Sequence, residues 1–295
     1  MKTVNNTTAR IEPDVFPVYS EVEFNIIISP GEVIYSGSII EVQLPNSFTN
    51  DQVSPSKTKT WQTLDPEDRH FISVSAGSLS EQDIKMDICN REYVGGYGTS
   101  TRHGRCVVIE LLRGKVTPDE EITVTFSNTT SPWLANQRPG ATEHEGLVLV
   151  MIDGKKVEPS PAYSVEAGSA VYSRLIIPSS ARPGEPFRVQ LVSLDAFNNL
   201  SSSACEASQI TCNGHIVGQM PAYTGRTETQ ISLETSGVHR LEVNGLLSNP
   251  IRICDAPAGP YWGDIHFHNY PSVDAMGNTP YEYARDVSCL DFAGT

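Results

Sequence analysis

Apolar residues recur at every second position along several stretches of the chain, and this period constrains the fold more than any other feature. In residues 22–28, 40–44 and 122–126, apolar side chains alternate with polar ones. Successive side chains of a β-strand point to opposite faces, so one set packs against a core and the other faces water. The pattern predicts a mainly β chain, and it places Glu41 and Gln43 on the water side of their strand.

Turn-rich segments divide this pattern into domains. Residues from about 15 to 165 predict an antiparallel β-sandwich, and residues 168–254 predict a second, immunoglobulin-like one with turns at short intervals. Within this second part, the segments 183–187 (PGEPF) and 195–199 (DAFNN) resemble filamin-type repeats. The Pro- and Gly-rich segment 255–260 marks the next boundary. The expected domains are a β-sandwich over 1–167, an immunoglobulin- or filamin-like sandwich over 168–255, and a third segment over 261–295.

The composition disfavours several partners. A formal net charge of −14 repels phosphate backbones and anionic membranes, so nucleic acid is not expected as a bulk ligand. No apolar run reaches the roughly 18 residues that a membrane span needs. Residues 1–10 are polar and lack the apolar core of a signal peptide. These features predict a cytoplasmic protein that does not interact with a membrane.

Six cysteines are present, and none belongs to a Cys-x-x-Cys pair. Their spacing fits neither a zinc ribbon nor a disulfide framework, which predicts unpaired and mostly buried thiols. Closure of a short loop by Cys205 and Cys212 is the alternative.

The stretch that carries chemistry is 261–269, with the sequence YWGDIHFHN. On a strand, Asp264, His266 and His268 share one face. Two neutral imidazoles on one face can converge on a divalent metal ion such as Zn, Mn or Fe. Asp264 is placed to orient a ligating ring by accepting its second N–H. A His-x-His pair alone is structural about as often as it is functional.

The residues that follow strengthen the functional interpretation. Thr279, Pro280 and Glu282 form the sequence signature of a capped helix start. Residues 290–295 then read as a new strand. The order strand, polar loop, helix and strand predicts a βαβ unit of an α/β barrel, in which working residues sit at the C-terminal ends of strands.

The segments 263–268 (GDIHFH), 272–275 (SVDA) and 290–292 (LDF) together resemble the opening of the PHP (polymerase and histidinol phosphatase) superfamily. More narrowly, they are similar to the bacterial domain-of-unknown-function 3604 family, whose members join β-rich N-terminal regions to a PHP-like barrel. The resemblance covers 261–295 only. Asn269 departs from it, since many members have Thr there.

This resemblance implies a cluster of divalent transition metal ions that activates water to hydrolyse phosphoesters. His266 and His268 match the first ligand pair, and Asp274 matches a further ligand position. Asp264 and Ser272 are expected beside these ligands. The substrate is expected to be a small molecule, with an anionic ester as one candidate, while the catalytic residues and the oligomeric state stay open.

Later ligands of such a cluster and the roughly 200 further residues of a barrel are not in the sequence. The segment is therefore expected to be the truncated start of the barrel and to be inactive by itself. Residues 261–295 are expected to be poorly ordered, or to be held only by docking on the second sandwich. The alternative function is a non-catalytic β-sandwich module that binds a glycan or a protein.

Overall fold

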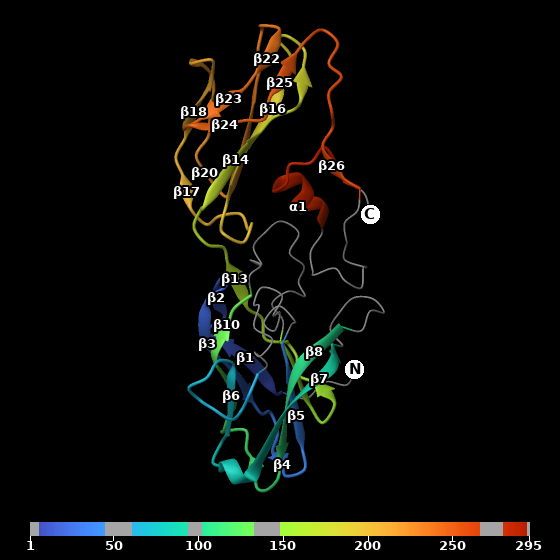
Figure 1. Cartoon of the computed structure of the whole chain (residues 1–295). Coiled ribbons are helices and arrows are strands. Elements are labelled where there is room, and N and C mark those ends of the chain that lie inside the picture. Colours follow the sequence, from blue (N-terminus) through green and yellow to red (C-terminus); the bar gives the residue numbers. More distant parts are fainter. Residues whose placement is uncertain (1–5, 45–60, 94–101, 133–147, 266–279, 294–295) are drawn as a thin grey trace. The chain divides into compact units, whose positions relative to one another are not determined.

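The computed structural model describes residues 6–44, 61–93, 102–132, 148–265 and 280–293 (Figure 1). The protein is mainly β, as the alternating pattern predicts. The described residues up to 166 form one compact unit, and those from 167 form another. In the described residues before 255, helical structure is limited to a single 3-10 turn, η3 (Glu81–Asp83). No helix of the described residues has the length and apolar character to cross a membrane.

Two antiparallel sheets form most of the first unit, in a β-sandwich-like arrangement. The sheet with order β1-β3-β10-β6 contains β1 (Thr8–Glu12), β3 (Glu21–Ser29), β10 (Ile122–Thr130) and β6 (Phe71–Ala76). The sheet with order β12-β11-β5-β8-β7 contains β12 (Lys155–Lys156), β11 (Leu149–Ile152), β5 (Ile39–Gln43), β8 (Arg102–Leu111) and β7 (Ile84–Tyr93). Two short pairs complete the unit: β13 (Ser164–Glu166) with β2 (Val15–Pro17), and β4 (Ile34–Tyr35) with β9 (Lys115–Val116).

An aromatic cluster anchors the core of the first unit. Phe24 of β3 lies opposite Phe126 of β10, and their rings stack with centroids 4.8 Å apart. Trp61 meets Phe126 edge-on at 5.2 Å, and Phe16 meets Phe24 edge-on at 5.3 Å. All four side chains are buried. Because such ring pairs add about 0.5–1.5 kcal/mol each beyond area burial, they fix the pairing of these strands.

The prediction that Glu41 and Gln43 face water is wrong, since both side chains are buried. Their strand β5 is central in its sheet, between β11 and β8. On their face of the sheet, Gln43 lies between Leu149 and Cys106, which are its partners on the two neighbouring strands. Apolar neighbours on both sides limit the access of water. A period-two pattern in the sequence does not distinguish a central strand from an edge strand.

Before residue 255, the second unit contains three sheets. The sheet with order β14-β16-β21-β20-β17 contains β14 (Tyr172–Ile176), β16 (Phe187–Leu194), β21 (Arg226–Ile231), β20 (Tyr223–Thr224) and β17 (Ala204–Cys205). The sheet with order β19-β18-β23-β24 contains β19 (His215–Met220), β18 (Ser208–Cys212), β23 (Leu241–Val243) and β24 (Leu246–Leu247). The third contains β15 (Ser180–Ala181), β25 (Ile251–Ile253) and β22 (Gly237–His239).

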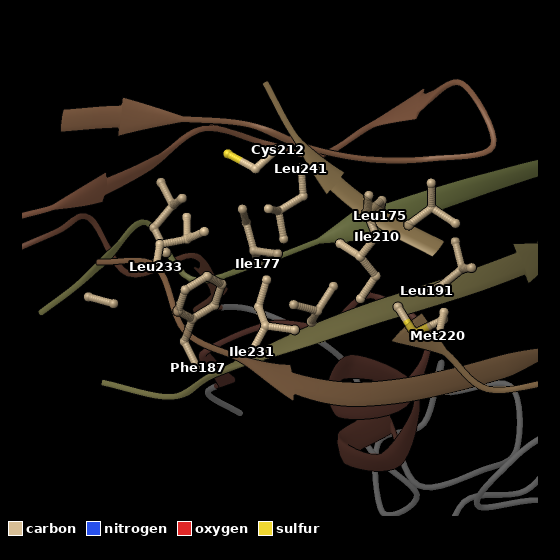
Figure 2. Close-up of a cluster of buried hydrophobic side chains, with 14 of the residues drawn as sticks. Leu175, Ile177, Phe187, Leu191, Ile210, Cys212, Met220, Ile231, Leu233 and Leu241 are labelled. Atoms are coloured by element: carbon tan, nitrogen blue, oxygen red, sulfur yellow. The ribbon is translucent and has the colours of Figure 1, made fainter. Parts of the chain in front are cut away.

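Side chains from all three sheets meet in one core, shown in Figure 2. Phe187 and Leu191 of β16, Ile210 of β18 and Ile253 of β25 are buried in it.

The predicted turn at 195–199 is also present. Asp195 is buried, and its carboxylate accepts the backbone N–H groups of Phe197 at 2.8 Å and Asn199 at 2.9 Å. This Asx-type bonding explains why Asp begins the turn.

A close approach to the core explains one glycine. A Cβ added at Gly218 of β19 would lie 2.5 Å from Cγ2 of Ile231. We expect Gly218→Ala to lower the free energy of unfolding of this unit by about 1–3 kcal/mol, because overpacking strains a filled core. Urea unfolding measures the change. In an Ile231→Ala background the penalty should shrink, and an equal penalty in both backgrounds would contradict the proposed clash.

Candidate metal site at the C-terminal βαβ unit

The C-terminal segment forms the βαβ order that the sequence predicts. β26 (Gly263–Asp264) pairs in parallel with β27 (Phe292–Ala293), with Gly263 opposite Phe292 and Asp264 opposite Ala293. Between them lies α1 (Pro280–Asp286). Parallel neighbours require a crossover connection, and here the connection includes a helix. The predicted helix start at Pro280 is confirmed, while its cap residue Thr279 lies outside the described residues.

Gly263 allows the two strands to approach each other. A Cβ at this position would lie 2.4 Å from the backbone oxygen and 2.6 Å from the ring of Phe292. Just before β26, the Trp262 N–H donates to the Asp291 carboxylate at 2.8 Å, and the Asp291 N–H donates to the Trp262 carbonyl at 2.7 Å. This reciprocal pair extends the contact between the segments by one residue on each side.

The helix end docks on a sheet of the second unit, which is one of the two alternatives that the sequence left open for this segment. Val287 and Cys289, which follow α1, pack with Val192 and Leu194 of β16 in a small buried cluster. The Tyr283 hydroxyl donates to the Asn198 carbonyl at 3.3 Å. Earlier in the chain, the Trp262 indole N–H donates to Ser179 Oγ at 3.0 Å. The docking therefore combines apolar contact with hydrogen bonds from both ends of the segment.

An ion pair reinforces this docking. The side chain of Asp286 is only 6% exposed and pairs with Arg226 of β21, which is 28% exposed. Arg285 also binds the Asp286 carboxylate with two hydrogen bonds of 2.7 and 2.9 Å. The hydrogen bonds from Arg285, together with the charge of Arg226, hold the pKa of Asp286 below its usual value against the opposing effect of burial.

The Cys289 thiol beside this ion pair is protonated at neutral pH. Its burial raises its pKa to about 11, although nearby arginines oppose the shift. A thiol is a metal ligand only as the thiolate. Cys289 therefore packs as an apolar side chain and is not a candidate ligand.

The structure places one of the predicted site residues. Asp264 is exposed and is the last residue of β26. His266, His268, Ser272 and Asp274 lie outside the described residues, so their prediction as ligands or ligand neighbours stays a prediction. Among the residues that are described, no group of three or more His, Cys, Asp and Glu side chains could hold a metal ion. The donor set in the sequence, two imidazoles and carboxylates, suits Zn, Mn or Fe.

The sequence analysis missed Arg226 and Asp286, which fasten the βαβ unit to the sandwich. An Arg-Asp pair at 285–286 is visible in the sequence, but it resembles any solvated helix end. Nothing in the sequence pairs Arg226 with a residue 60 positions later. Only the fold reveals that contact.

No protein-family model matches the chain, and no curated protein matches it. Among solved structures, the chain is similar to the adhesin InvE of Yersinia pseudotuberculosis, with 8% sequence identity and a TM-score of 0.24. The match covers 84% of this chain and 58% of that one. The chain thus corresponds to little more than half the length of the matched structure.

Proposed function

We propose that residues 261–295 begin a metal-dependent hydrolase domain of the PHP kind, which uses metal-activated water on a phosphoester. The observation that supports this proposal most is the parallel pairing of β26 and β27 through α1. The His-x-His sequence follows directly after the end of β26. In α/β folds with parallel strands, functional residues gather at the carboxyl ends of the strands.

The roles of the residues follow from their chemistry. His266 and His268 would hold the metal through neutral ring nitrogens, and Asp274 through carboxylate oxygens. Asp264 would accept the remaining ring N–H of a ligating histidine, which would fix its tautomer and orientation. When bound, a divalent ion lowers the pKa of water towards 7 and polarises the scissile bond. Ser272 would stand beside these ligands as a hydrogen-bonding neighbour.

The substrate class follows from the overall charge. The net charge of −14 repels large polyanions, whereas a small anionic ester can be held by a local cationic centre. We therefore propose a small phosphoester as the substrate. The sandwich-like unit that begins at residue 167 acts as the support on which the βαβ unit docks.

The test is hydrolysis of p-nitrophenyl phosphate and bis(p-nitrophenyl) phosphate by the protein expressed from its own gene, with Mn²⁺ or Zn²⁺ added. We expect metal-dependent activity that His266→Ala and His268→Ala each reduce at least about 100-fold, the upper end of the effect of removing an outer partner of a ligand. His215→Ala is the matched control, because His215 is an exposed residue of β19.

Two results would contradict the proposal. Full activity in both variants would contradict the assignment of His266 and His268 as metal ligands. Absence of metal-dependent hydrolysis in the unmodified protein would instead favour a non-catalytic β-sandwich module that binds a glycan or a protein.

A further inference from the structure

Two of the six cysteines face each other across neighbouring strands. Cys89 of β7 lies directly opposite Cys106 of β8 in an antiparallel register that runs without a shift from Ile84–Leu111 to Tyr93–Arg102. No disulfide joins them. Directly opposed residues of an antiparallel pair point to the same face of the sheet, so the two cysteine side chains are neighbours on that face.

The ladder fixes the spacing of this pair. The Leu112 N–H donates to the Asp83 carbonyl at 2.7 Å, one step before the first pair of β7 and β8. Because hydrogen-bonded and non-hydrogen-bonded pairs alternate, Cys89 and Cys106 form a hydrogen-bonded pair, with Cα atoms about 5.5 Å apart. Disulfides most often span about 5.5–6 Å between Cα atoms. The Cα spacing therefore lies in the range of disulfides, and a small shift of the edge strand β7 brings the Cβ atoms into the closer range that a bridge needs.

The other four cysteines do not have such a partner in the strands that the structure describes. Cys205 faces Tyr223, and Cys212 faces His215 and Leu241. Burial raises the pKa of the Cys212 thiol, as it does for Cys289. The pair on β7 and β8 thus differs from the rest in its geometry.

The two thiols of the pair also differ in access. Cys89 is half-buried and lies on β7, the edge strand of its sheet. Cys106 is 1% exposed, and its thiol donates to the Val107 carbonyl at 3.7 Å. A small oxidant therefore reaches Cys89 first, and Cys106 is placed to resolve the product.

We propose that Cys89 and Cys106 are a redox-active dithiol that small disulfides oxidise to a cross-strand disulfide. With glutathione disulfide, the Cys89 thiolate attacks one sulfur of the oxidant and releases one glutathione thiol. The Cys106 thiolate then attacks Cys89 Sγ in this mixed disulfide and releases the second glutathione thiol. The protein loses two electrons and two protons, and glutathione disulfide gains them. The bridge ties the edge strand β7 to β8, independently of the metal chemistry proposed above.

The test is incubation of the folded 295-residue chain with glutathione disulfide, followed by alkylation, denaturation and counting of the remaining thiols. We expect the count to fall from six to four, with a peptide that links Cys89 to Cys106 in the mass spectrum. Dithiothreitol should restore all six. Cys205→Ser, a half-buried cysteine in the second unit, is the control and should still form the linked peptide.

The variants Cys89→Ser and Cys106→Ser should each abolish the linked peptide. The Cys106→Ser variant should instead retain one glutathione on Cys89, and an intact-mass spectrum should show this mixed disulfide as an increase of about 305 Da. An unchanged thiol count in the unmodified chain, or linkage of Cys89 to any other cysteine, would overturn the proposal.

Discussion

Asp286→Ala is expected to release α1 from the sheet of the second unit. The Asp286 side chain is almost fully buried and is the partner of Arg226 on β21. Removing one partner of a buried pair costs about 3–5 kcal/mol when it leaves the other charge without compensation. Arg226 retains Glu228 at 3.1 Å and is partly exposed, so we expect a smaller cost of about 1–3 kcal/mol. The docking contact is small, so a loss of this size is expected to release α1 from the sheet.

Amide hydrogen exchange measures the release. The amides of Val287 and Leu290 bond to carbonyls in α1 and should lose most of their protection in the variant. The core strands β16 and β21 should keep theirs. Asp255→Ala is the matched control, since it removes an exposed carboxylate just after β25. Unchanged protection at Val287 and Leu290 in Asp286→Ala would show that apolar packing alone holds the segment.

The same ion pair makes the docking sensitive to acid. Because the pKa of Asp286 is lowered in the folded protein, its stabilising contribution is fully present above the ordinary carboxyl pKa of about 3.9. The contribution is lost as pH falls through the folded-state pKa. Protection at Val287 should therefore be constant from neutral pH down to about pH 4 and decrease below it.

The 295-residue chain is expected to bind Zn²⁺ about 100-fold more weakly at pH 5.5 than at pH 8. Imidazole has an ordinary pKa of about 6.5, so at pH 5.5 the protonated form of a histidine outnumbers the neutral form about tenfold. Because only the neutral form binds the metal, each of the two proposed histidine ligands weakens the affinity by a factor of about 10. Two such ligands multiply to the factor of about 100. Affinity at pH 8 should itself be weak, since the proposed site has only His266, His268 and Asp274 in this chain.

Competition with a chromogenic chelator at fixed ionic strength measures this ratio. Carboxylates stay ionised over the same pH range, so binding through them alone would be nearly independent of pH. A ratio near one would therefore assign Zn²⁺ to carboxylates and not to the histidines.

The strands were predictable because burial alternates with the sequence pattern. In β10, Ile122, Val124 and Phe126 are buried and the threonines between them are half-buried, as period two requires. Glu41 and Gln43 on β5 follow the same pattern in the sequence yet are buried. Strand order decides this difference, and strand order depends on contacts between residues that are distant in the sequence.

The C-terminal segment shows a similar division. The helix start at Pro280 and the order strand, helix, strand follow from local signals, namely a proline, helical spacing and a short apolar run. The contact that fastens the helix depends on Arg226, which belongs to another sheet. The facing of Cys89 and Cys106 is another such contact, because it requires the register of β7 against β8.

The most direct test of the account is the Zn²⁺ affinity at pH 8 of three proteins. These are the unmodified chain, a double variant that carries both His266→Ala and His268→Ala, and the His215→Ala variant. The account predicts that the double variant loses binding while His215→Ala binds as the unmodified chain does. Amide exchange at Val287 verifies that the βαβ unit stays docked in each variant. Equal affinity in all three proteins, with the segment docked, would contradict a metal site at His266 and His268.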